Sequence, residues 1–455
     1  MLQETLGRYA VSLKFADLPP LAKHHARRVV LDWFAATIPG GIIQPATGIA
    51  KALSEEVGRG GARLVPSGQP AGVRAAALIN GTAAHTIEFD DIFRDGIYHP
   101  GAPTIAAALA AAQATGVDGS RFLAGVVAGF EVGNRVARAM GAPHYAMWHM
   151  TATVGCIGAA AAVANILGLT PEQAAHAIGN ATTMAGGLQQ AFRSDAMTKP
   201  MHGGLAAQSG CTAAMTAKAG VTAAARMLEG EVGFGMATGK NVDWNSVTAD
   251  LQGHFTVTEM TQKNHACCGH NFAAVDGVIA LRNEYKLKPA DVRRVRTGVY
   301  GKAVEIVGSP DPKTSYEAKF SLPYCAAVAL RDGRARMAAF EPHMLHDPEI
   351  RDIMKRVTVE KDDWADAGFP TRRSAMVWIE TTDGRTLEHR APTRKGDPEN
   401  PLTDEELNDK YRELVPPVTG EAVAKELLDV LWRVDTVTDL SRLPMGAEVA
   451  AAAAQ

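Results

Sequence analysis

Cysteine is scarce in this sequence. Its 455 residues include five cysteines with no regular spacing: Cys156, Cys211, Cys267, Cys268 and Cys325. A secreted protein stapled by disulfides normally has an even number of cysteines at ordered spacings. The sequence therefore argues against a disulfide framework, and we expect a protein of the reducing cytoplasm.

Long apolar runs and a surplus of one charge are also missing. The longest apolar run, residues 157–169, contains Asn165 and is shorter than the roughly 20 residues that a membrane span needs. The formal net charge is −3, with both signs mixed along the chain. No basic region followed by an apolar stretch opens the sequence, so we expect no signal peptide. We expect neither a membrane nor a nucleic acid as a partner.

Familiar cofactor and nucleophile motifs are absent as well. The sequence has no Walker loop, no Gly-x-Gly-x-x-Gly after a strand, no Gly-x-Ser-x-Gly elbow and no His-Glu-x-x-His. These absences disfavour nucleotide cofactors, serine hydrolysis and zinc proteolysis. The chemistry that remains is carried by His, Lys, Asp, Glu or Tyr without a cofactor.

The length and the residue patterns predict two domains, because 455 residues are too many for one ordinary hydrophobic core. In residues 1–258, segments rich in Ala, Leu, Val and Met are separated by short Gly, Pro or Asp breaks, which predicts helices. Residues 398–455 return to a helical pattern with a capping box that begins at Thr403. We expect the Ala-rich tail from Met445 to be frayed.

Residues 259–397 have a different pattern. The stretches 292–300 and 375–382 are β-branched and alternating, which predicts strands. Thr382-Asp-Gly-Arg385, followed by another alternating stretch, is typical of a hairpin turn. Helical patterns lie between the strands, so we expect a smaller α+β domain.

The loop of residues 85–104 is unusually polar for the helical region, and loops between buried helices often collect catalytic groups. It offers two histidines and three closely spaced carboxylates: His85, His99, Glu88, Asp90 and Asp91. These groups suit acid–base chemistry or metal binding. The Asp pair could instead cap the next helix or pair with an arginine. No His-x-x-x-His or similar spacing accompanies them, so we predict no metal.

Three further segments place single polar residues at sites suited to anions. His149 precedes an expected helix start, whose free backbone donors favour an anionic ligand, although it could also be a packed core histidine. Lys199 precedes a proline at another helix start and would add a cation suited to a carboxylate, unless it is a solvated turn residue. Lys263 lies at the join of the two domains, and interdomain clefts are common ligand sites. We expect Cys267 and Cys268 nearby to be buried structural residues.

These polar segments, taken in order, resemble the MmgE/PrpD family over nearly the whole chain. The resemblance rests on Asn80-Gly-Thr-Ala-Ala-His85, Phe89-Asp-Asp91 with His99-Pro, Trp148-His149 with Thr151 and Gly155, Met197-Thr-Lys-Pro-Met-His202, Lys263 with Cys267-Cys-Gly-His270, Glu317-Ala-Lys-Phe-Ser321 with Tyr324, and Asn400-Pro-Leu-Thr403. It implies a mainly α fold, in which residues 1–258 with 398–455 form a large all-helical domain. Residues 259–397 would form an inserted α+β lid domain, and the protein would be a homodimer.

The resemblance also implies a small di- or tricarboxylate as the substrate and no metal or organic cofactor. Positions that match the family's active-site residues are the catalytic candidates: His99, His149, Lys199, Lys263 and, on a looser match, Tyr324. Five further side chains are our candidates for binding the substrate: Glu88, Asp91, Ile92, Arg193 and His202.

Three positions depart from the family pattern. Glu88 stands where the family's decarboxylases have Asp, Ile92 where they have Thr, and Phe272 where another family position has His. The stretch from Asp91 to His99 is also longer than in the decarboxylase. A longer acid and a lost hydroxyl change the pocket's reach and hydrogen bonding, so cis-aconitate decarboxylation is the least expected of the family's reactions.

Our leading hypothesis is a cofactor-independent lyase that dehydrates a hydroxy di- or tricarboxylate, as 2-methylcitrate dehydratase does. Such a reaction needs a base near neutral pH and fixed cations for the developing enolate, which the histidines and lysines could supply. An epimerase acting beside a carboxylate, like iminodisuccinate epimerase, is the alternative. A third hypothesis is a non-catalytic protein that binds polycarboxylates.

Overall fold

The computed structural model describes residues 1–194, 196–251 and 253–446. The chain separates into two compact units. The first, which we call the helical unit, comprises Met1–Gln262 and the segment that begins at Thr403. The second, the α+β unit, comprises Lys263–Leu402. The domain boundaries expected at 258/259 and 397/398 stay a proposal, and residues 447–455, most of the tail expected to be frayed, lie outside the described residues.

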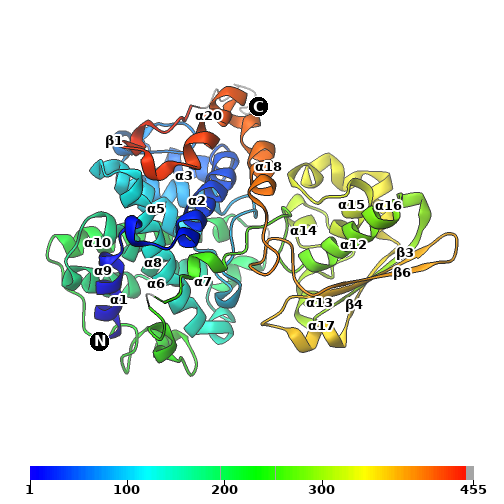
Figure 1. Cartoon of the computed structure of the whole chain (residues 1–455), viewed down its shortest axis with the longest axis horizontal. Coiled ribbons are helices and arrows are strands. Elements are labelled where there is room, and N and C mark those ends of the chain that lie inside the picture. The colour runs from blue at the N-terminus through cyan, green and yellow to red at the C-terminus, as the bar shows by residue number, and fades with distance from the viewer. Residues whose placement is uncertain (195, 252, 447–455) are drawn as a thin grey trace. The chain divides into compact units, whose positions relative to one another are not determined.

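The mainly helical fold is confirmed (Figure 1). The α-helices of the helical unit are α1 (Leu2–Ser12), α2 (Pro20–Gly40), α3 (Ala46–Ala52), α4 (Val73–Ala84), α5 (Gly101–Thr115), α6 (Gly119–Tyr145), α7 (Met150–Thr153), α8 (Gly155–Ile166), α9 (Pro171–Thr183), α10 (Thr198–Lys218), α11 (Phe234–Thr238), α18 (Asp404–Leu414), α19 (Pro416–Thr419) and α20 (Glu421–Leu431). Its short 3-10 helices are Phe15–Asp17, Arg94–Gly96, Gln189–Phe192, Trp244–Val247, Thr256–Glu259, Val434–Thr436 and Leu440–Arg442. A small antiparallel pair, β1 (Val57–Arg63) with β2 (Pro70–Ala71), completes this unit. None of the described helices has the length and apolarity of a membrane span.

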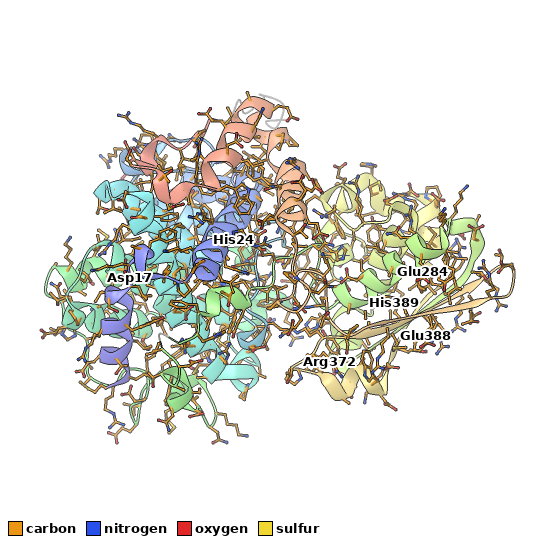
Figure 2. The ribbon with its side chains drawn as sticks, viewed as in Figure 1. Asp17, His24, Glu284, Arg372, Glu388 and His389 are labelled. Carbon is orange, nitrogen blue, oxygen red and sulfur yellow. The ribbon has the colours of Figure 1, made fainter. Side chains whose placement is uncertain are left out.

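The C-terminal helices return to the N-terminal ones. Helix α18 lies beside α2 (Figure 1), and the side chains of Arg28 and Asp404 join the two helices by an ion pair. His24, labelled in Figure 2, stacks on Trp432 with ring centroids 5.8 Å apart. Both ends of the chain therefore contribute to one core, as expected for a unit in which apolar helix faces bury one another.

Helix α10 packs closely on α4 because glycines face the contact. A Cβ at Gly204 would lie 2.1 Å from the carbonyl oxygen of Leu78, and a Cβ at Gly203 would lie 2.9 Å from that of Gly81. Larger residues at these two positions would push the helices apart. The close approach holds the first turns of α10 beside the C-terminal end of α4.

The α+β unit contains a four-stranded sheet in the order β4-β3-β5-β6. Its strands are β3 (Val292–Val299), β4 (Val357–Lys361), β5 (Ala375–Thr381) and β6 (Thr386–Ala391), and its helices are α12 (Phe272–Tyr285), α13 (Gly301–Val307), α14 (Ser315–Lys319), α15 (Leu322–Asp332), α16 (Pro348–Met354) and α17 (Asp363–Gly368), with short 3-10 helices at Pro289–Asp291, Met337–Phe340 and Pro342–His346. Strands β3 and β4 are parallel, and the other neighbouring pairs are antiparallel. The hairpin predicted at 382–385 is confirmed between β5 and β6, and Gly384 there has a φ of 89°.

Candidate active site

Sequence-distant stretches meet where α10 approaches α4. His85 follows the last residue of α4, and Lys199 and His202 lie in the first turns of α10. His149 immediately precedes α7, where its backbone N–H donates to the carbonyl oxygen of Gly187 at 2.9 Å. The loop that carries His99 leads directly into α5. These elements form one polar site within the helical unit.

Four histidine rings form a continuous cluster at this site. The ring centroid of His85 lies 4.9 Å from that of His99 and 5.5 Å from that of His149, and the centroids of His149 and His202 are 5.1 Å apart. Three rings are deeply buried, whereas the side chain of His99 is 16% exposed. The structure therefore brings together His99, His149 and His202, and it adds His85, which the sequence offered for acid–base chemistry but which was not among the catalytic or substrate-binding candidates.

The two loop histidines are held by oxygen atoms. Nδ1 of His99 donates to the carbonyl oxygen of Asp91 at 2.7 Å, and Oδ2 of Asp90 lies 3.3 Å from the same nitrogen. Nδ1 of His85 faces Oδ2 of Asp90 at 2.6 Å. Because these oxygens accept hydrogen bonds, each Nδ1 carries a proton and each Nε2 is a bare base in the neutral ring. Burial also lowers the pKa of His85 to about 4, which keeps this ring neutral.

The other two histidines, His149 and His202, contact each other through their rings. Nδ1 of His149 lies 2.9 Å from Nδ1 of His202. Burial lowers the pKa of His149 well below its ordinary value, and the neighbouring rings of His85 and His202 add to this effect. Burial and the cation of Lys199 lower the pKa of His202 to about 4. At neutral pH both rings are therefore uncharged.

A buried ion pair lies next to the histidine cluster. Nζ of Lys199 donates to the Oε1 atom of Glu88, and the two residues are 3% and 5% exposed. Glu88 has a φ of 61°, a strained left-handed conformation for a residue with a Cβ. The ring of Phe192 lies below the ammonium group, with its centroid 5.6 Å away, and also contacts His149 edge to face at 4.8 Å. A cation and a carboxylate are thus positioned beside uncharged bases.

Asp91 has a capping contact, which is the alternative that its sequence position allowed. Its Oδ1 atom accepts from the backbone N–H of Gly101 at 3.1 Å, at the start of α5. Burial, followed by the charge of Asp90, raises the pKa of Asp91 well above its ordinary value. Its Oδ2 atom is buried without a partner among the described residues. A role in binding substrate stays a prediction for this residue.

The loop is also anchored from the C-terminal segment. Nζ of Lys410 on α18 donates to Oδ1 of Asp32 at 2.6 Å and to the carbonyl oxygen of Phe89 at 2.6 Å. Lys410 and Asp32 are at most 1% exposed. Burial raises the pKa of Asp32, and the charge of Lys410 opposes that rise. This contact connects the returning helix to the backbone between Glu88 and Asp90.

Two of the substrate-binding candidates differ in exposure. Ile92 is 5% exposed, and its backbone exchanges two hydrogen bonds with Thr261, at 2.9 and 2.8 Å. Arg193 follows the 3-10 turn of Gln189–Phe192, and its side chain is exposed. The structure therefore buries Ile92 within the loop, paired through its backbone with Thr261, and leaves Arg193 exposed at the protein surface.

Two catalytic candidates belong to the α+β unit. Lys263 is the first residue of this unit. Tyr324 lies on α15 with its side chain fully buried, and its hydroxyl donates to the carbonyl oxygen of Ala339 at 2.6 Å. That hydrogen bond gives Tyr324 a packing function within the unit. Catalytic roles for both residues stay predictions.

One group of side chains has the composition of a metal site. Ligand atoms of His85, Asp90 and His99 lie within 4.8 Å of one another. Two imidazoles and a carboxylate are suitable ligands for zinc or another transition metal. However, each histidine nitrogen that faces these oxygens already has an acceptor for its proton. Hydrogen bonds are thus sufficient to explain the arrangement, and the expected absence of a metal stays a prediction.

The sequence signals differed between His85, which was named for acid–base chemistry but left out of the catalytic candidates, and the pair of Lys410 and Asp32, which was missed. His85 ends the stretch Asn80-Gly-Thr-Ala-Ala-His85, which belongs to the family pattern, so its motif could have placed it in the site. Lys410 sits in an amphipathic stretch where a lysine normally faces solvent, and Asp32 sits within an apolar helix. For those two residues no local pattern indicated a role.

Comparisons with known proteins agree with this architecture. The model of the MmgE/PrpD N-terminal domain matches residues 4–246, and that of the MmgE/PrpD C-terminal domain matches residues 265–435. The cis-aconitate decarboxylase-like protein oryM of Aspergillus oryzae is 27% identical over 96% of this chain and 95% of its own. The cis-aconitate decarboxylases of Aspergillus terreus (26% identical, 96% of this chain and 93% of its own) and Homo sapiens (25%, 97% and 93%) are similar too. With both family domains present, the chain belongs to the MmgE/PrpD family.

Proposed function

We propose that this protein is a lyase that acts on a small di- or tricarboxylate by moving a proton at a carbon beside a carboxylate. The observation that carries the proposal is the cluster of four histidines beside the Lys199–Glu88 ion pair, in which burial lowers the pKa of His85, His149 and His202. Membership of the MmgE/PrpD family and the decarboxylase names of its relatives support lyase chemistry. Uncharged imidazoles can accept protons, and a buried cation can stabilise an enolate.

The preferred reaction is dehydration of a hydroxy polycarboxylate that resembles 2-methylcitrate. In this reaction the bare Nε2 of His99 takes the proton from the carbon beside the carboxylate. His149 donates a proton to the departing hydroxyl, which leaves as water, and the electrons of the broken C–H bond form the new double bond. Lys199 binds a substrate carboxylate and thereby exchanges part of its contact with Glu88. Lys263 and Tyr324 enter the proposal through the family resemblance alone.

Decarboxylation is the second candidate, because the relatives are named cis-aconitate decarboxylases. Loss of carbon dioxide leaves a carbanion that must be protonated, and the same histidines would supply that proton. Two residues favour dehydration instead. By the family resemblance, Glu88 and Ile92 stand where decarboxylases have Asp and Thr. The carboxylate of Glu88 also accepts a hydrogen bond from the ammonium group of Lys199. The longer acid and the lost hydroxyl change the contacts that a cis-aconitate carboxylate would find.

Proton NMR in deuterated water separates these reactions in one experiment. The purified protein is incubated with citrate, 2-methylcitrate, cis-aconitate and malate, and a His149→Ala variant serves as the inactive control. We expect a new vinyl signal to grow from a hydroxy acid while that acid's own C–H signals decrease. Conversion of cis-aconitate into a product with one carboxylate fewer, seen as new signals that replace those of cis-aconitate, would establish the second candidate instead. Deuterium entering a substrate of unchanged composition would indicate an epimerase, and the absence of any change would overturn the proposal.

A further inference from the structure

The contact between His149 and His202 restricts where protons can lie. The two Nδ1 atoms are 2.9 Å apart, and the residues are 1% and 5% exposed. A hydrogen bond between two nitrogens requires one of them to carry the proton and the other to be bare. Since a neutral imidazole has one proton, the donor ring has a bare Nε2 and the acceptor ring has a protonated Nε2.

The outer nitrogen atoms of this pair have no hydrogen-bond partner among the described residues. Among the described residues, Nε2 of His85 is enclosed without a partner, whereas Nε2 of His149 and of His202 is neither enclosed in this way nor hydrogen-bonded. Among the described residues, the pair therefore has one nitrogen without a hydrogen bond at each end and a shared proton between them. This is the arrangement of a two-ring proton wire.

We propose that His202 is a positioning residue that sets the proton on His149 and relays protons between His149 and solvent. The proposal rests on the proposed function, in which His149 donates a proton to the departing group. For His149 to donate a proton from Nε2, Nδ1 of His202 must be the donor to Nδ1 of His149 in the resting pair. His149 then holds its own proton on Nε2, which is the nitrogen that would donate to the departing group.

The relay conserves protons and charge. Nε2 of His149 gives its proton to the departing hydroxyl, and Nδ1 of His149 takes the proton of Nδ1 of His202. Nε2 of His202 then takes a proton from solvent, so both rings end uncharged. After product leaves, the reverse shift restores the resting pair, with a proton entering at His149 and another leaving at His202. His99 separately returns its proton to solvent.

The groups around the pair favour uncharged rings. Lys199, one turn before His202 on α10, opposes protonation of both rings. His85 and His99 oppose protonation of His149 from the side of the loop. Among the described residues, no carboxylate has a hydrogen bond or ion pair with either ring. A charged intermediate is thus disfavoured, which makes a concerted shift through two uncharged rings the favourable route.

Nitrogen NMR of ¹⁵N-histidine protein tests the pair without any substrate. In the wild type we expect one bare Nδ1, one protonated Nδ1, and a protonated Nε2 on His149. Replacement of His202 by Ala should convert His149 to a mixture of its two neutral forms. His176→Ala is the matched control, because His176 lies on α9 and its ring accepts from the backbone N–H of Ala223. If both rings of the wild type carry their protons on Nε2, the proposal is overturned.

Kinetics of the same variants provide the second readout. We expect His202→Ala to lower kcat by roughly tenfold to a hundredfold, with KM within about twofold, because proton delivery and not substrate binding is impaired. His202→Asn restores a side-chain amide near Nδ1 but cannot pass a proton onward. If His202→Asn restores the proton position on His149 but not kcat, His202 both sets that position and relays protons. If His202→Asn restores kcat fully, the proposed relay is overturned. If no substrate reacts, the proposed function fails, while the NMR result still decides the pair.

Discussion

The loop of residues 85–100 and the His149–His202 pair hold their histidines in different ways. In the loop, Asp90 and the carbonyl oxygen of Asp91 accept from Nδ1, which determines the proton position on His85 and His99. In the pair, two nitrogens share one proton, and either can hold it. The difference indicates that the loop provides a base of defined tautomer, whereas the pair provides a proton that can move.

The loop's base has the largest expected effect. His99→Asn removes the bare Nε2 while leaving a side chain of similar polarity, so kcat should fall by roughly 10²- to 10⁴-fold with little change in KM. Steady-state kinetics on the substrate found by NMR measure this, with His176→Ala as the control. A kcat within threefold of the wild type would show that His99 is not the base. The loop would then not provide the base that distinguishes it from the His149–His202 pair.

The contact of Lys410 on α18 with the loop should affect the position of His99 more than that of the His149–His202 pair. Lys410→Met leaves Asp32 as a buried carboxylate without this cation, so the free energy of unfolding should fall by about 3–5 kcal/mol. Urea unfolding measures the loss, and the double variant Asp32→Asn with Lys410→Met should recover part of it. ¹⁵N signals of His99 should shift more than those of His202. Equal shifts in both regions would contradict the comparison.

Lys199 lies beside both regions, and its replacement tests substrate binding. A charge-assisted hydrogen bond contributes roughly 1.5–3 kcal/mol, so Lys199→Met should lower kcat/KM by roughly tenfold to a hundredfold, mainly through KM. Because Glu88 would lose the contact with this cation, Glu88→Gln with Lys199→Met is the matched control for stability. An unchanged KM would show that the carboxylate binds elsewhere.

The smallest expected effect is on the pH dependence of stability. The pKa of His85 and that of His202 are both lowered from 6.5 to about 4 in the folded protein. Between these values the unfolded chain binds more protons, so the free energy of unfolding should decrease as pH falls from about 6.5 to about 4. Urea unfolding at pH 7, 5.5 and 4.5 measures the slope. His202→Ala should make the slope shallower, and an unchanged slope would show that this ring does not contribute.

Much of the fold followed from local patterns. The Ala-rich segments predicted a mainly helical fold, and the alternating segments with Thr382-Asp-Gly-Arg385 predicted a hairpin, because helix and strand periodicity depend on neighbouring residues. The sequence also pointed to His99, His149 and Lys199 as candidates. It did not indicate that Glu88 would pair with Lys199, because that contact depends on how the loop after α4 meets the first turn of α10.

The amino-acid sequence by itself determined the family, the helical and α+β segments and the polar stretches that contain the candidate residues. Only the tertiary structure decided which of those side chains meet. It brought His85 into the cluster, placed Lys410 beneath the loop and turned His149 and His202 toward each other. The physical reason is that proton positions and ion pairs depend on distances of a few ångströms between residues far apart in the chain, which local periodicity does not encode.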